Sequence, residues 1–423
     1  MNVRFRTTHN LSQQPLALPV PGFQVQLFES MEAAQALWSR IEPPDEFLKS
    51  RYLGLLERHP PRGMRFTYAV FFHGEDPVGV AYFQISHFRP DRSIRQDDSE
   101  DRYPCIIRAM GRYLKRFVAS QFDHNLLVCG NLLLTGEHGF WFDSNRVDTQ
   151  TGFRLLLDAV QHVHSQWERL GLFIDGIFIK DIEPRHLPKT SVFIEHKFRK
   201  FTFHPNMVLF LDPTWETFDD YLAALQSKYR VRARRAFKAA ASLEVKALDL
   251  DFVRRHSDRL FQLYLAVMDN ASFNMVVLHE RYLVAMKETY GEDFQVTGYF
   301  EGGELVGFCT TLLNGEELEA HFLGFDETVN RQHQLYLNML YHMIEQAMAK
   351  RCKRLVYART AMEIKSSVGA VPIDMLCFIK AAHPVTNKIL PHLIKYLQPP
   401  DDWVQRHPFR ETKHEVPASN PGD

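Results

Sequence analysis

The chain has 423 residues, enough for two domains that each bury a core of their own. Apolar residues make up 45% and charged residues 24% of the sequence, which is typical of a globular protein in water. The formal net charge of −1 excludes a protein that is basic over its whole surface, so any contact with nucleic acid or membrane needs a local cluster of cations.

The cysteines predict neither a disulfide framework nor a zinc ribbon, because they are odd in number and no Cys-x-x-Cys pair occurs. They are Cys105, Cys129, Cys309, Cys352 and Cys377. The opening MNVRFRTTHN has no apolar core of signal-peptide length, and no apolar run approaches the ~20 residues of a membrane helix. We therefore expect a soluble, cytoplasmic protein with no membrane span and no metal site.

The first half of the chain predicts an arm and then an α/β domain. Residues 1–22 form the arm and residues 23–204 the domain, with an insertion near 89–125. Within the domain we expect, in chain order, helices at 31–41 and 47–57, a hairpin at 66–85, a helix at 150–170 and a strand at 172–180.

The second half, residues 205–398, predicts a second domain followed by a tail at 399–423. Its expected elements, in chain order, are a strand at 207–211, a basic helix from 217, helices at 254–268 and 279–289, a hairpin near 296–313, a strand at 318–324, a helix at 331–350 and a strand at 354–361.

The two halves repeat one pattern. YAVFFHGEDPVG, from Tyr68, and VTGYFEGGELVG, from Val296, each read as a strand, a glycine turn and a second strand opened by Val-Gly. In both halves an amphipathic helix and a further strand follow. The repeat predicts two related domains, each a mixed sheet of about six strands flanked by helices, with a cleft between them.

Two local motifs resemble a known group of enzymes. LDPTWETFDDYLAALQSKYRVRARRA, residues 211–236, resembles the segment that opens the second domain of the Fem ligases, and IKSSVG, residues 364–369, resembles their F-K-x-x-F-G element. The likeness is good over 207–380 and extends to BioF2-like acetyltransferase domains. It implies an α/β (α+β) fold of two tandem GNAT-like acyl-CoA N-acyltransferase domains.

The resemblance implies an N-acyltransferase. An acyl or aminoacyl group would pass from acyl-CoA or aminoacyl-tRNA to a small-molecule amine, without metal or a permanently bound cofactor. One departure matters: the R/Q-x-x-G-x-G/A loop that binds the diphosphate of CoA at a helix N-terminus is missing from both halves. A non-catalytic relative that binds an anionic ligand or RNA therefore stays open.

The basic helix is the first candidate for ligand binding. Six cations occur in eleven residues with no acid among them, a density suited to a diphosphate or an RNA backbone. The alternative is a solvated helix paired with acids elsewhere. The cations are Lys228, Arg230, Arg232, Arg234, Arg235 and Lys238.

Lys365 is the matching lysine of the Fem element, and the resemblance makes it a candidate catalytic residue. We expect it to be exposed and free to meet a developing negative charge. Arg359 and Glu363 precede it as candidate substrate-binding residues, and Gly369 would let the backbone turn beside a ligand. The alternative is a surface lysine in a polar turn.

Glu319, His321 and Tyr357 lie on the two predicted central strands of the second copy. Glu319 and His321 share a face of their strand, and either could accept a proton from an attacking amine. A purely structural His and Glu pair is the alternative. Asn270 and Phe273 belong to a loop that would cover the acceptor or simply cap a helix.

Overall fold

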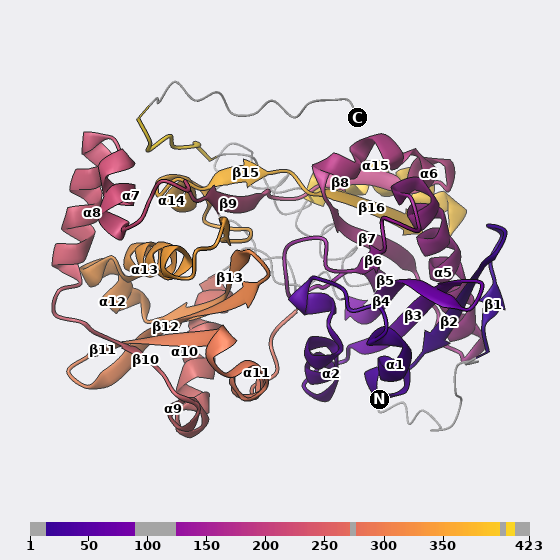
Figure 1. Ribbon diagram of the computed structural model, residues 1–423, viewed down its shortest axis with the longest axis horizontal. Coiled ribbons are helices and arrows are strands. Elements are labelled where there is room, and N and C mark those ends of the chain that lie inside the picture. The colour runs from indigo at the N-terminus through magenta and orange to yellow at the C-terminus, as the bar shows by residue number, and fades with distance from the viewer. Residues whose placement is uncertain (1–13, 89–123, 271–275, 398–402, 411–423) are drawn as a thin grey trace, which may run out of the picture.

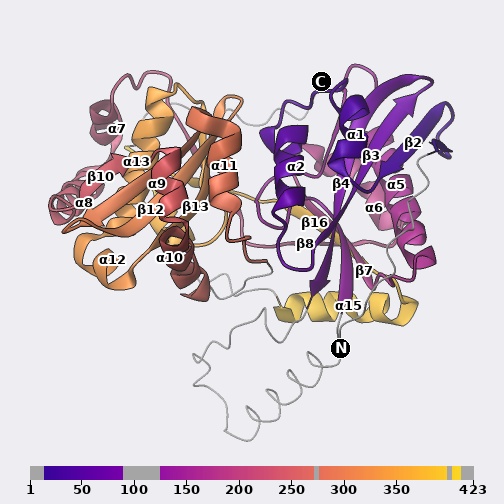
Figure 2. The same ribbon diagram turned by 90° about the horizontal axis from the view of Figure 1, so that it is seen from below.

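The structure is a computed structural model that describes residues 14–88, 124–270, 276–397 and 403–410. Two α/β units lie side by side, and each is built on one sheet with helices against it (Figures 1 and 2). The predicted arm lies mostly outside the described residues, as do almost all of the insertion and much of the tail.

The first sheet has nine strands in the order β1-β2-β3-β4-β5-β7-β16-β8, with β6 beside β4. Of its neighbouring pairs only β5 and β7 are parallel. The strands are β1 (Leu16–Ala17), β2 (Phe23–Phe28), β3 (Arg65–His73), β4 (Asp76–Phe88), β5 (His124–Cys129), β6 (Phe140–Phe142), β7 (Gly176–Ile182), β8 (Arg199–Thr202) and β16 (Leu376–Ala381).

The helices of the first unit are α1 (Met31–Trp38), η1 (Glu46–Leu48), α2 (Ser50–Arg58), α5 (Thr149–Arg169), η2 (Pro184–Lys189), α6 (Ser191–Glu195) and α15 (Pro384–Leu397). The longest, α5, begins where the side chain of Asp148 accepts hydrogen bonds from the first turn. Its apolar residues recur every three or four positions, as at Phe153, Leu156, Val160 and Val163, so one face of the helix is buried against the sheet.

The second sheet has seven strands in the order β10-β11-β12-β13-β14-β9-β15, and here only β13 and β14 are parallel. The strands are β9 (Asn206–Phe210), β10 (Glu244–Ala247), β11 (Phe294–Glu301), β12 (Glu304–Asn314), β13 (Glu317–Phe325), β14 (Arg354–Val356) and β15 (Val371–Ile373).

The helices of the second unit are α7 (Phe218–Ala224), α8 (Ser227–Ala239), α9 (Leu250–Arg255), α10 (Ser257–Asn270), α11 (Tyr282–Tyr290), η3 (Gly291–Asp293), α12 (Glu327–His333), α13 (Leu335–Ala349) and α14 (Met362–Ser366). Thr217 and Asp220 form a reciprocal capping box that fixes the start of α7. The described part of the tail, 403–410, bonds to this region: Phe409 forms a β-bridge with Leu225.

The strand orders confirm the predicted repeat. β2-β3-β4-β5-β7-β16-β8 and β10-β11-β12-β13-β14-β9-β15 match position by position, and the single parallel pair stands at the same place in each. The predicted fold class, two mixed α/β sheets in tandem, is therefore confirmed.

The match also reveals an exchange of strands. β16 follows the second unit in sequence but lies between β7 and β8 of the first sheet, while β9 lies between β14 and β15 of the second. The predicted second domain, 205–398, is thus wrong at its C-terminal end, since β16 and α15 belong to the first unit. Strand pairing over such sequence distances leaves no local signal, which is why the pattern of apolar residues could not place β16.

The exchange ties the units together, and one apolar cluster crosses the junction. Phe47 and Tyr52 from the first unit pack in the same buried cluster as Tyr282 and Leu283 from the second. Helices α2 and α11 meet there, as Figure 2 shows. Among the described helices, none combines the length and the apolar character needed to cross a membrane.

Candidate functional site

The junction of the two units holds the strand edge from which a candidate site is built. β13 pairs with β14 only over Glu317–Glu319, and beyond that point β14 turns away. The turn is strained, because three residues without a glycine's freedom have positive φ: Ala358 (59°), Thr360 (69°) and Ala361 (48°). The predicted strand 354–361 therefore ends at Val356, and β13 has no partner on this side from Ala320 onward.

β13 contains a β-bulge at this edge of the sheet. The register between β12 and β13 shifts between Cys309 and Thr311, and Thr310 fills the gap by bonding both to the carbonyl and to the N–H of Phe322. Glu319 and His321 lie just before and within this bulge, so both predicted residues lie at the open edge.

Glu319 is buried beside polar groups of both units. Burial raises the pKa of Glu319 to about 7, although the nearby charge of His138 and a hydrogen bond from Asn314 oppose the rise. Asn314 also donates to Asp45, at 2.9 Å, and accepts from the N–H of Glu46. A carboxyl group that titrates near neutral pH is suited to receive a proton in a reaction.

His138 of the first unit is held as an imidazolium. Its Nδ1 lies 2.7 Å from the carboxylate of Asp45 and its Nε2 lies 3.2 Å from the carbonyl oxygen of Thr135, so both nitrogens face acceptors and both carry hydrogen. Burial would lower its pKa, but the charge and hydrogen bond of Asp45 outweigh it and raise the pKa of His138 to about 9.

His321 is neutral instead. Burial and the charge of His138 lower the pKa of His321 to about 3. The ring stacks on Phe47, and its Nε2 lies 2.8 Å from the hydroxyl of Tyr282. The Nδ1 atom is sealed from solvent and has no hydrogen-bond partner among the described residues.

Lys365 is not the exposed residue that the sequence predicts. It is buried, and its ammonium donates to three backbone carbonyls: those of Tyr357 at 2.7 Å, Ala358 at 3.2 Å and Arg359 at 2.6 Å. Burial lowers the pKa of Lys365 to about 7. A lysine whose three donors are saturated by the strained turn holds that turn in place, and has no donor left for a ligand.

The other predicted residues around Lys365 also have structural partners. Tyr357 is buried and its hydroxyl donates to the carbonyl of Leu340 in α13, at 2.7 Å. Glu363 accepts from the Nε of Arg406 in the described part of the tail, at 3.1 Å. Gly369, with φ of 105°, lies against the ring of Phe409 rather than beside an open site.

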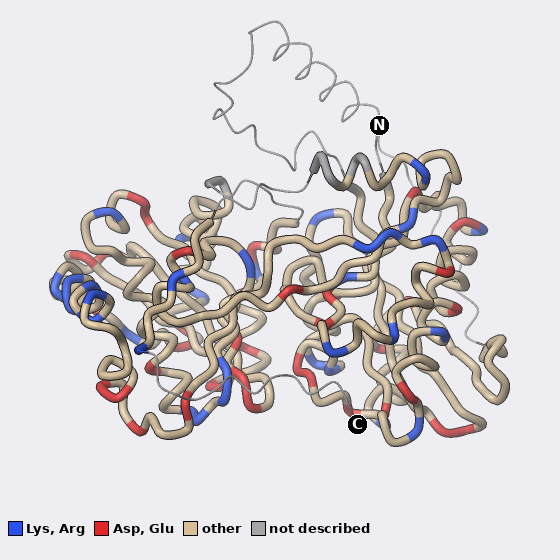
Figure 3. Tube along the Cα trace, turned by 90° about the horizontal axis from the view of Figure 1, so that it is seen from above, with Lys and Arg blue, Asp and Glu red and all other residues tan. Residues whose placement is uncertain are grey.

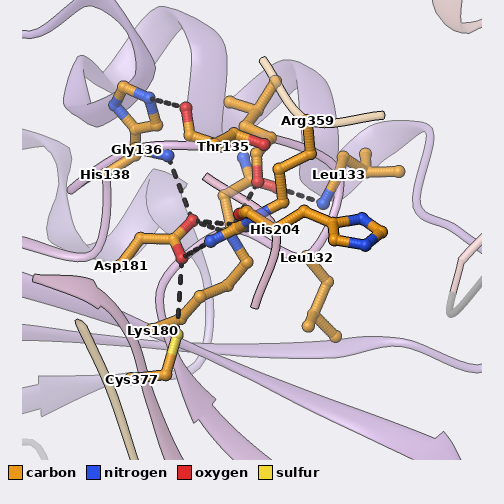
Figure 4. A network of polar contacts seen from close by, with 12 residues as sticks. Leu132, Leu133, Thr135, Gly136, His138, Lys180, Asp181, His204, Arg359 and Cys377 are labelled. Atoms are coloured by element: carbon orange, nitrogen blue, oxygen red, sulfur yellow. Dashed lines mark hydrogen bonds and ion pairs between the residues drawn. The ribbon is translucent and has the colours of Figure 1, made fainter. Parts of the chain in front are cut away.

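Arg359 closes a buried network between the units (Figure 4). Its guanidinium pairs through two nitrogens with the carboxylate of Asp181 and donates from Nε to the carbonyl of His204, at 2.8 Å. Asp181 also pairs with Lys180 and accepts from the N–H of Gly136 at 3.1 Å. Burial alone would raise the pKa of Asp181, but the two cations hold it well below its usual range. Arg359 thus joins the two units.

Helix α8 carries the predicted basic surface at one end of the molecule (Figures 1 and 3). Its apolar side, Tyr229, Ala233 and Ala236, is buried in the second unit. Four of the cations are exposed: Lys228, Arg234, Arg235 and Lys238. The other two, Arg230 and Arg232, are half-buried. No ion pair joins these six to an acid within the described residues.

The N-termini of α5 and α12, the helices that follow the fourth strand in the two copies, are both occupied by a carboxylate and leave no place for the diphosphate of CoA. In the first unit, the side chain of Asp148 occupies the N–H groups of Gln150 and Thr151 at the start of α5. In the second, Asp326 caps the short helix α12, which is inserted before α13. A carboxylate at the helix start repels phosphate.

The predicted acceptor loop lies mostly outside the described residues. Asn270 ends α10, and Phe273 lies outside the described residues.

Several residues of the junction were missed from the sequence. His138, Asp45 and Asp181 lie in segments without any motif. Tyr52 and Tyr282, in contrast, share a signal: each is the centre of an Arg-Tyr-Leu tripeptide that precedes the hairpin of its copy, at 51–53 and 281–283, although the same tripeptide also occurs at 112–114. Aligning the two copies through their helices would have found this pair.

Residues 226–366 match the family model described as Acetyltransferase (GNAT) domain. The match runs from the start of α8 to α14 and includes the open edge of β13. This segment is therefore similar to a GNAT acetyltransferase domain, in agreement with the resemblance. No curated protein matches the chain.

The chain is also similar to solved structures of low sequence identity. "Crystal structure of FemX" has a TM-score of 0.48 at 11% identity and covers 86% of this chain and 98% of its own. The C-terminal domain of a putative lysylphosphatidylglycerol synthetase from Agrobacterium fabrum has 0.46 at 10%, covering 86% and 96%. A tandem GNAT protein from the clavulanic acid biosynthesis pathway has 0.45 at 9%, covering 86% and 99%.

Proposed function

We propose that the protein is an N-acyltransferase with its reacting centre at the open edge of β13, and that Glu319 is the general base. The observation that carries this is the position of Glu319: it is the last residue of β13 that pairs with β14, inside the GNAT segment, with its pKa raised to about 7. The substrates are an activated acyl donor and a small-molecule amine.

The proposed reaction balances without metal or covalent enzyme intermediate. The amine nitrogen attacks the carbonyl carbon of the acyl donor and forms the new C–N bond, while Glu319 takes the proton that the nitrogen loses. The bond to the carrier breaks, C–S in an acyl-CoA or C–O in an aminoacyl ester, and the departing sulfur or oxygen takes up the proton that Glu319 received, which returns Glu319 to its ionised form. Glu319 acts only in its ionised form.

Glu319→Gln is expected to lower turnover by about 10²–10⁴-fold, because the amide cannot accept the proton. In the wild type the rate should rise with pH through about 7 and then level off, as Glu319 ionises. That rise should be absent from the variant. The measurement is initial rate against pH, with acyl-CoAs and aminoacyl-tRNA each offered to a panel of amines.

Stability separates this role from a structural one. A carboxyl group whose folded-state pKa is raised stabilises the fold below its unfolded pKa and loses that contribution as the pH rises through 7. Glu319→Gln should therefore melt at the same or a higher temperature than the wild type at pH 8. Glu316→Gln, at an exposed neighbour paired with Lys353, is the matched control. A wild-type rate in Glu319→Gln would refute the assignment.

We propose further that the basic face of α8 binds phosphate groups of the carrier. Two features support this: the face has no acid of its own, and Lys228 and Arg230 stand in the first turn, where the helix dipole disfavours cations. Like charges four residues apart, as at Arg230 and Arg234, repel as well. An anion on this face would offset both costs. The diphosphate of CoA and the backbone of tRNA share this chemistry.

Replacing Arg234 and Arg235 together by Ala should weaken carrier binding by about tenfold per arginine, since hydrogen bonds to charged groups are the strong ones. Affinity should fall with added salt in the wild type and less so in the variant. Calorimetric titrations with CoA and with tRNA distinguish the two carriers. Arg254→Ala/Arg331→Ala removes two exposed arginines that have acid partners and should change nothing. Equal affinity in both double variants would mean that α8 is a solvated helix that does not bind the carrier.

A second candidate function is a non-catalytic protein that binds an anionic ligand or RNA. The occupied helix starts of α5 and α12 favour it, because they remove the usual diphosphate site. Binding through α8 without turnover of any donor would select this candidate. The buried free thiols Cys129, Cys309, Cys352 and Cys377 support a reducing compartment, for which we propose the cytoplasm.

A further inference from the structure

A chain of hydrogen bonds crosses the junction from one unit to the other. The amide nitrogen of Asn131 lies 3.0 Å from the hydroxyl of Tyr52, this hydroxyl lies 3.2 Å from that of Tyr282, and Tyr282 lies 2.8 Å from Nε2 of His321. Asn131 and both tyrosines are buried, and His321 is half-buried.

The chain follows the internal repeat. Tyr52 is on α2 and Tyr282 on α11, the helices that stand before β3 and β11 in the two copies. Asn131 comes two residues after the last pair of β5 with β7, and His321 two residues after the last pair of β13 with β14. The two ends of the chain are therefore equivalent positions occupied by different residues.

The direction of the hydrogen bonds is fixed from the Asn131 end. Its oxygen accepts from the N–H of Leu133, at 2.9 Å, and lies 3.5 Å from the amide nitrogen of Gln84, so its own nitrogen donates to Tyr52. If Tyr52 then donates to Tyr282 and Tyr282 donates to His321, every hydroxyl proton in the chain has an acceptor. The reverse order would leave the buried proton of Tyr52 without one, at a cost of about 1–3 kcal/mol.

This direction determines which nitrogen of His321 carries the proton. A neutral imidazole has one N–H and one acceptor nitrogen. Because Nε2 accepts from Tyr282, the N–H is at Nδ1, the atom that has no partner among the described residues. Asn131, at the equivalent place in the first unit, has partners on both its oxygen and its nitrogen. Of these two equivalent residues, His321 therefore has a ring nitrogen with no partner among the described residues, whereas each polar atom of Asn131 has at least one.

We propose that His321 acts as a hydrogen-bond donor and not as a base: its Nδ1–H binds the carbonyl oxygen of the acyl group that reacts beside Glu319. Tyr52 and Tyr282 are positioning residues that hold His321 in this tautomer. The role of the donor rests on the proposed function, since a carbonyl oxygen gains negative charge when an amine attacks it, and a fixed donor stabilises that charge. The tautomer itself does not depend on that function.

The tautomer is measured by nitrogen NMR on the full chain labelled with ¹⁵N-histidine, with the His321 signals assigned by their loss in His321→Gln. The wild type should show a protonated Nδ1 and an unprotonated Nε2 from pH 5 to 8. Tyr282→Phe removes the donor to Nε2 and should move the proton to Nε2 or give a mixture. Tyr221→Phe, a buried tyrosine bonded to the carbonyl of Val368, is the control and should leave the signals unchanged.

An Nε2–H signal in the wild type would overturn the proposal, and so would a Tyr282→Phe spectrum identical to that of the wild type. Tyr52→Phe provides a second test if Tyr282→Phe does not fold, because it interrupts the chain one bond earlier. With an acyl donor that the enzyme turns over, Tyr282→Phe should lower kcat by about 10–100-fold with little change in KM, and the rise of the rate near pH 7 should persist. If no acyl donor is turned over, the proposed acyltransferase function fails, whereas the tautomer of His321 is still decided by the NMR spectra.

Discussion

Asp181→Asn is expected to destabilise the protein by about 3–5 kcal/mol, as when one partner of a buried ion pair is removed. The substitution keeps the shape of the side chain. Asparagine also tolerates the positive φ of 59° at this position, so the backbone is not the cause. The loss of charge leaves Lys180 and Arg359 facing each other in a buried site.

Arg359→Met should cost less, about 1–3 kcal/mol, because Lys180 and Gly136 still satisfy the carboxylate. Asp181→Asn should destabilise more than Arg359→Met, because Asp181 is the one acid that both Lys180 and Arg359 share. Chemical denaturation at pH 7, with the midpoint and slope compared among the variants, measures it. Arg185→Met, an exposed arginine beside Glu183, is the control and should be neutral. A larger loss in Arg359→Met than in Asp181→Asn would contradict this account of the network.

Local sequence patterns predicted much of the fold. The two hairpins and the amphipathic helices depend on neighbours within a few residues, and their predicted positions agree with β3–β4, β11–β12, α5 and α13. The exchange of β9 and β16 could not be predicted in this way. Each strand reads as a short apolar run, and nothing within it states which of two similar sheets it will join.

The candidate site divides in the same manner. Glu319 and His321 were found because they lie on one strand at a spacing of two. Their partners, Asp45 and His138, are far away in sequence and meet them only because the two units pack together. The motif around Lys365 was recognised, but its environment was not, since burial depends on how the turn after β14 folds back.

Lys365→Met is expected to destabilise the protein by about 2–4 kcal/mol, where an exposed lysine would cost almost nothing. The side chains are similar in length, but methionine cannot donate. The substitution removes the ammonium that three backbone oxygens share, within a turn that already contains three non-glycine residues of positive φ. The melting temperature should fall by several degrees.

Two further variants identify the cause of this loss. Lys388→Met, at an exposed lysine of α15, should leave the melting temperature unchanged. Lys365→Arg should also destabilise, because a planar guanidinium cannot direct three donors at oxygens that converge on one nitrogen. Below its melting transition, Lys365→Met should retain near-normal turnover per folded molecule. A variant with wild-type stability and lost turnover would instead make Lys365 a catalytic residue. The Nδ1–H of His321 would then no longer be needed to stabilise the oxygen of the reacting carbonyl.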